Sequence, residues 1–105
     1  LPPRLEVFFA GHEYNFSLRR LAFPTTLRVL DLGNEFDKPL IRSINWPPCL
    51  AVLKFGNVFN QSFEGIRLPN GLRELWLGWN FSYSLQTVEL PQTLQVLGFG
   101  PEYSR

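Results

Sequence analysis

The sequence predicts a mainly β solenoid in which short coils stack on one another. An apolar residue followed by proline recurs at spacings of 22, 23, 22 and 22 residues, with prolines at positions 2, 24, 47, 69 and 91. A leucine stands three residues after each proline and a glycine nine residues after it. A fixed period of this length marks a repeat architecture whose units stack to build one core. We therefore expect a single solenoid over residues 1–105, with four full coils and a partial fifth: 1–22, 23–45, 46–67, 68–89 and 90–105.

Each coil is expected to contribute one short parallel strand. Positions are counted here as offsets from the proline of each coil, and apolar residues recur at offsets three, six and eight. These positions suit an inward face that packs on the neighbouring coil. Offset six is occupied by Phe8, Leu30, Leu53, Leu75 and Leu97. No segment shows the roughly ten residues of amphipathic period that a helix requires, so we expect little or no helix.

The residues that follow each expected strand turn the chain. The glycine at offset nine allows either a positive φ or a close approach between coils. Offset twelve is always aromatic, which predicts a core position: Tyr14, Phe36, Phe59, Phe81 and Tyr103. The next position is polar, and we expect its side chain to cap a turn through its own backbone. These polar residues are Asn15, Asp37, Asn60, Ser82 and Ser104.

The repeating pattern resembles a known family. Residues 46–61 read as an apolar residue, then Pro-x-x-Leu-x-x-Leu-x-Phe-Gly-x-x-Phe-Asn-Gln, continuing through Phe63 and Ile66 to Leu68 and Pro69. This pattern resembles the FNIP repeat, a relative of the leucine-rich repeat. Coils one and two depart from it, with Phe-Phe-Ala at 8–10 and Phe-Asp-Lys-Pro at 36–39. The resemblance implies a leucine-rich-repeat-like solenoid with a role in protein interaction, and it brings no catalytic residues.

The outward positions of the strands are the candidate binding residues. With the leucines facing inward, offsets four, five and seven face outward, and offset ten follows on the adjoining rim. Valines fill offset five in four of the five coils, and Trp76 and Trp79 are expected to lie close together. Exposed aliphatic and aromatic side chains are typical of binding surfaces. We therefore predict the partner-binding residues Phe9, His12, Val29, Val52, Lys54, Glu74, Trp76 and Trp79.

Two simpler interpretations of these outward residues stay open. The valines could serve β propensity alone, and one tryptophan could fold over the edge of a coil. Asp31 and Lys54 share an offset on adjacent coils, so we expect a cross-strand ion pair of about 0.2–1 kcal/mol between them.

Composition argues against several classes of function. The net charge is +1 and the basic residues are spread along the chain, which argues against nucleic-acid binding. No apolar run approaches the roughly 18 residues of a membrane span, so no membrane insertion is expected. Cys49 and His12 are the only residues of their types, and we expect no metal site, no cofactor and no enzyme activity. A single cysteine favours a reducing, intracellular (cytoplasmic) location.

Three functions remain from the sequence. The favoured one is a scaffold that binds a protein or peptide on its strand face. The second is a structural spacer within a larger assembly, and the weakest is glycan binding by the tryptophans with Asn57 and Asn80. Neither end carries a polar capping coil, so we expect a fragment of a longer chain whose ends are covered by further repeats or by a partner.

Overall fold

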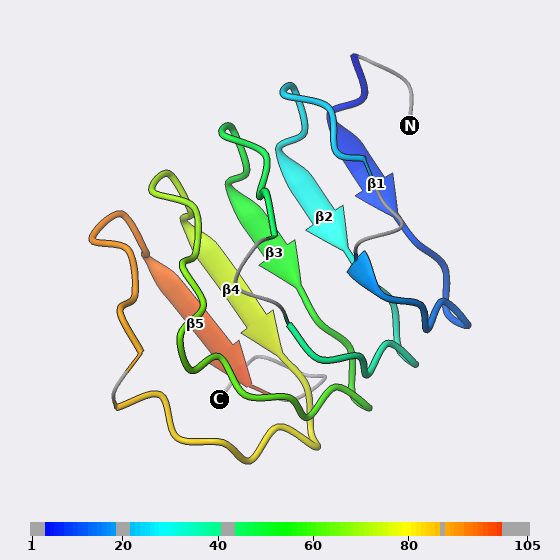
Figure 1. Cartoon of the computed structure of the whole chain (residues 1–105), viewed down its shortest axis with the longest axis vertical. Coiled ribbons are helices and arrows are strands. Elements are labelled where there is room, and N and C mark those ends of the chain that lie inside the picture. The colour runs from blue at the N-terminus through cyan, green and yellow to red at the C-terminus, as the bar shows by residue number, and fades with distance from the viewer. Residues whose placement is uncertain (1–3, 19–21, 41–43, 87, 100–105) are drawn as a thin grey trace.

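The protein is a parallel β-solenoid of about four turns, and the predicted fold class is confirmed. The computed structural model describes residues 4–18, 22–40, 44–86 and 88–99. Its five short strands are β1 (Val7–Phe9), β2 (Val29–Asp31), β3 (Val52–Lys54), β4 (Glu74–Leu77) and β5 (Val96–Phe99). They form one sheet in the order β1-β2-β3-β4-β5, and the chain loops back between successive strands (Figure 1). The residues that the structure describes contain no α-helix.

The sheet register follows the repeat. Leu53 lies opposite Leu30 on one side and Leu75 on the other, so equal offsets pair across the strands. Leucines at offsets three, six and eight are fully buried in the middle coils: Leu27, Leu30, Leu32, Leu50, Leu53, Leu72, Leu75 and Leu77. Each coil thus supplies a layer of leucines that its neighbours cover, which is why a single coil is not stable alone.

An aromatic column forms the second part of the core. The rings at offset twelve stack nearly parallel, with centroid distances of 6.0 Å from Tyr14 to Phe36, 5.9 Å from Phe36 to Phe59 and 6.2 Å from Phe59 to Phe81. Phe55 packs against Phe59 at 4.1 Å. The predicted core role of this position therefore holds in coils one to four, and Tyr103 lies outside the described residues.

The glycine column is required because the coils approach closely. Gly33 has a φ of 83°, and a Cβ there would overlap the carbonyl oxygen of Gly11. At Gly56 and Gly78 φ is not positive, yet a Cβ would still overlap the backbone of the preceding coil. Close stacking is thus the requirement that Gly33, Gly56 and Gly78 share, and positive φ is an additional one at Gly33.

In coils one to three the polar residue at offset thirteen bonds to the next coil, which corrects the prediction that it caps its own turn. The side-chain oxygen Oδ1 of Asn15 accepts the backbone N–H of Asp37 at 2.8 Å, and Asp37 accepts that of Asn60 at 2.9 Å. Asn60 in turn accepts the N–H of Ser82 at 3.0 Å. The reason is geometric: stacking brings the next coil's N–H within reach, and an otherwise unpaired amide is costly.

A second polar ladder runs at offset ten. Asn34 Oδ1 accepts the N–H of Asn57 at 3.3 Å, and Asn57 Oδ1 accepts the N–H of Trp79 at 3.3 Å. Side chains thus continue the inter-coil hydrogen bonding beyond the strands, and they hold the loops of successive coils at a fixed spacing.

Candidate binding face

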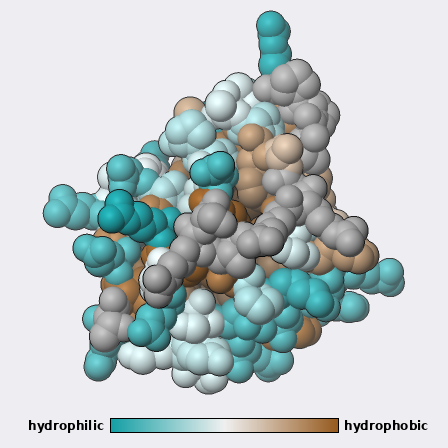
Figure 2. Space-filling model, viewed as in Figure 1, coloured by the Kyte–Doolittle hydropathy of each residue, from teal (hydrophilic) through white to brown (hydrophobic). Residues whose placement is uncertain are grey.

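Outward side chains of β1 to β5 form the strand face, the sheet surface opposite the leucine core. Val7 is 60% exposed, while Val29 and Val52 are half-buried between their neighbours. Apolar side chains also reach the surface elsewhere, and Figure 2 shows hydrophobic residues in several separate places among hydrophilic ones. Exposure alone therefore does not single out the strand face, and its shape and charge must be considered.

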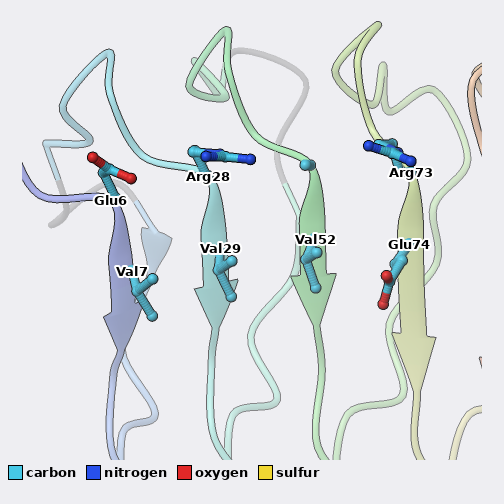
Figure 3. Close-up of a pocket in the computed structure, with 8 residues that line it drawn as sticks. Glu6, Val7, Arg28, Val29, Val52, Arg73 and Glu74 are labelled. Atoms are coloured by element: carbon cyan, nitrogen blue, oxygen red, sulfur yellow. The ribbon is translucent and has the colours of Figure 1, made fainter.

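The strand face carries a hollow of about 410 Å³ across β1 to β4, named here the upper groove. It is lined by two rows of residues, at offsets four and five: Glu6, Arg28, Ala51 and Arg73, and Val7, Val29, Val52 and Glu74. Figure 3 shows the valines and Glu74 side by side on successive strands, with Glu6, Arg28 and Arg73 at the strand starts. The groove therefore combines an aliphatic floor with a charged rim.

Backbone hydrogen bonds fix the spacing of the charged rim. The Glu6 carbonyl accepts the N–H of Arg28 at 2.7 Å, and the Arg28 carbonyl accepts that of Ala51 at 2.8 Å. The Ala51 carbonyl accepts the N–H of Arg73 at 2.8 Å. Because consecutive rim residues are hydrogen-bonded through their backbones, the spacing of the rim backbone is set before any ligand binds, so no entropy is lost in ordering that backbone.

A second hollow of about 290 Å³, the lower groove, lies at the other end of β1 to β3. The predicted residues Phe9, His12 and Lys54 line it, and the rings of Phe9 and His12 meet edge to face at 5.4 Å. The predicted ion pair is wrong, because no Asp31–Lys54 salt bridge exists in the described structure. Asp31 Oδ1 instead accepts the N–H of Gly33 at 3.0 Å, which turns the carboxylate towards its own chain.

The two tryptophans differ in what they offer a partner. A Cβ on Gly98 would overlap the Trp76 ring, so the indole lies over β5, and its Nε1 donates to Glu74 Oε1 at 3.0 Å. Trp76 is thus half-buried and covers the neighbouring coil. Trp79 is 54% exposed, just beyond the end of β4. Of this pair, Trp79 has the larger exposed fraction.

The structure divides the predicted partner-binding residues into three places. The upper groove contains Val29, Val52 and Glu74. The lower groove contains Phe9, His12 and Lys54, and the two tryptophans lie in coil four. The prediction left out the rim residues Arg28, Ala51 and Arg73, although they occupy the offset-four column that was expected to face outward.

Other kinds of site lack support within the described residues. No group of three or more histidine, cysteine or acidic side chains there is placed to hold a metal ion. Nor does that part of the chain include a helix with the length and apolar character needed to cross a bilayer. Cys49 is a free, exposed thiol.

Stacked coils with one strand each and a mixed aliphatic and charged strand face define a repeat-solenoid protein. The FNIP Repeat family model matches residues 59–101. This match confirms the resemblance to the FNIP repeat that the coil pattern predicted. The repeats form a family that is not known for enzyme activity. No curated protein matches the chain significantly.

Proposed function

We propose that the protein is a non-catalytic scaffold that binds a protein or peptide on its strand face. The observation that carries this proposal is the upper groove, in which Val29 and Val52 form an aliphatic floor beneath a charged rim across four strands. A sheet with one buried and one solvated face needs no outward valines for its own core. Partly exposed aliphatic side chains in a hollow offer a partner apolar area, and the polar rim offers orientation.

The rigidity of the coil stack supports the same proposal. The sheet under the groove packs on the leucine layers and the aromatic column. Two ladders of polar side chains fix the loops beside it through hydrogen bonds between coils. A partner then meets a preformed surface, and little free energy is lost in ordering it.

The proposal is tested with a crosslinking pull-down from the native source. The binding variant carries Val29→Thr, Val52→Thr and Trp79→Ala, which removes aliphatic and aromatic surface but keeps the β-branched residues that suit a strand. The control variant carries Phe16→Ala and Tyr83→Ala, two aromatic residues that are 52% and 49% exposed outside the strands. A partner captured by the wild type and the control but lost from the binding variant supports the scaffold. Identical partners in all three contradict it.

A structural role is the second candidate, and one observation favours it. Leu97 and Phe99 are 37% and 45% exposed, although the corresponding leucines of the middle coils are fully buried. Further repeats or a partner placed against β5 would cover this apolar surface. A spacer of this kind would keep its neighbours after changes on the strand face and would lose them only when the core is disrupted.

A further inference from the structure

We propose that the upper groove recognises an extended acidic peptide segment of a partner protein. One aspartate or glutamate carboxylate of that segment lies over Ala51, between Arg28 and Arg73, while neighbouring aliphatic side chains cover Val29 and Val52. This inference rests on the proposed function, because it names the class of partner that the same groove binds.

The first support is the arrangement of cations around a small residue. Arg28 and Arg73 occupy the same offset two coils apart, and Ala51 holds that offset in the coil between them. Adjacent strands are about 4.8 Å apart, so the two arginine backbones are separated by roughly 10 Å. Figure 3 shows their guanidinium groups on either side of the start of β3. A long side chain at position 51 would fill this space, whereas alanine leaves it open to a ligand.

The second support is that the carboxylates of the groove do not neutralise these arginines. No salt bridge joins Arg28 or Arg73 to Glu6 or Glu74 in the described structure. Glu74 Oε1 accepts the indole N–H of Trp76 instead, and Figure 3 shows the Glu74 carboxylate below Arg73 and away from its guanidinium group.

Both guanidinium groups keep donors for a ligand. Arg73 Nη2 donates to Gln95 Oε1 at 3.3 Å, a bond to a neutral amide that uses one of its five N–H groups. Among the described residues these two cations have no acidic partner, and they lie on either side of one gap. This arrangement suits a planar carboxylate that can accept hydrogen bonds from both sides.

The dimensions and charge balance favour a short peptide over other anionic partners. The groove crosses β1 to β4, a distance of about 14 Å, which matches roughly four residues of extended chain. Its valine floor suits aliphatic side chains on either side of the carboxylate. Glu6 and Glu74 at the two ends would repel a polyanion, so a nucleic-acid backbone fits poorly.

The test is selection from a displayed library of random linear peptides, carried out in parallel on five proteins. These are the wild type, the charge-reversal variant Arg28→Glu/Arg73→Glu, the single variant Ala51→Glu, the strand-face variant Val29→Thr/Val52→Thr/Trp79→Ala and a control, Lys38→Glu/Arg67→Glu. The control changes the net charge as much as the charge reversal does, but outside the groove. Ala51→Glu keeps both arginines and supplies a carboxylate of the chain's own between them.

The proposal expects acidic residues to be enriched among peptides selected on the wild type and on the control. This enrichment should disappear with Arg28→Glu/Arg73→Glu and with Ala51→Glu. In fluorescence polarisation, the best wild-type peptide should bind the charge-reversal variant about tenfold more weakly or worse, as expected from losing a hydrogen bond to a charged group.

The other outcomes separate this inference from the proposed function. Peptides without acidic preference, or with a preference that survives charge reversal, overturn the acidic-peptide inference. If those peptides still require Val29, Val52 and Trp79, the scaffold stands. If no peptide is enriched, or if binding is unaffected by both the strand-face and the charge-reversal variants, the inference and the proposed function both fail.

Discussion

Truncation of Leu53 tests whether the leucine column is the source of the solenoid's stability. Leu53 is fully buried between Leu30 and Leu75, which are themselves fully buried. Leu53→Ala removes a side chain packed on both sides by neighbouring coils, and we expect a loss of about 2–5 kcal/mol in the free energy of unfolding. Urea denaturation followed by circular dichroism measures this loss through the shift of the midpoint.

Leu97 provides a matched control in the same column. It pairs with Leu75 on β4 and is 37% exposed, so Leu97→Ala removes less buried surface and should cost about 1–2 kcal/mol. The difference between the two variants is the informative quantity, because both make the same chemical change at the same offset. Equal losses, or a loss below about 1 kcal/mol at Leu53, would refute the view that stacked leucines carry the stability.

Two further substitutions test how the coils are held together. Gly56→Ala places a methyl group against the backbone of the preceding coil and should lower the free energy of unfolding by about 1–3 kcal/mol or more. The control Gly71→Ala has open space around the new methyl group and should stay within about 1 kcal/mol of the wild type. Thermal denaturation measures both. Equal effects would contradict the close-approach argument. Asp37→Ala leaves the N–H of Asn60 without its acceptor and leaves the side-chain amide of Gln61 only the backbone carbonyl of residue 37, so it should cost about 1–3 kcal/mol in urea denaturation. Asp37→Asn keeps a side-chain acceptor oxygen and should cost less than about 1 kcal/mol. If Asp37→Asn destabilises as much as Asp37→Ala, the negative charge matters more than the ladder.

The sequence predicted the features that repeat in every coil. Inward leucines, the glycine and the aromatic residue recur at fixed offsets, and a parallel stack must place equal offsets in register. Leu30, Leu53 and Leu75 therefore fall opposite one another as expected. The pattern also predicted the outward column of Val29 and Val52, because alternation along a strand is fixed by backbone geometry.

The sequence did not predict where long or polar side chains turn. Asp31 has two available partners, Lys54 across the strands and the N–H of Gly33 nearby, and the local one is used. The Trp76 ring lies over Gly98 of the next coil. This contact is possible only because glycine has no side chain there. The inter-coil role of Asp37 was also missed. A column of Asn and Asp residues in the sequence does not show whether each side chain accepts a backbone N–H of its own coil or of the next coil. The sequence does show the Arg28, Ala51 and Arg73 column, but only the structure shows a groove there.

The central claim is that the strand face, rather than the outer loops, contacts a partner. The most direct measurement is site-specific photocrosslinking in the native source, with a photoreactive amino acid incorporated at position 52 in the upper groove or at position 83 outside the strands. The account predicts that position 52 crosslinks to a partner and that position 83 does not. Crosslinks from position 83 alone would contradict it.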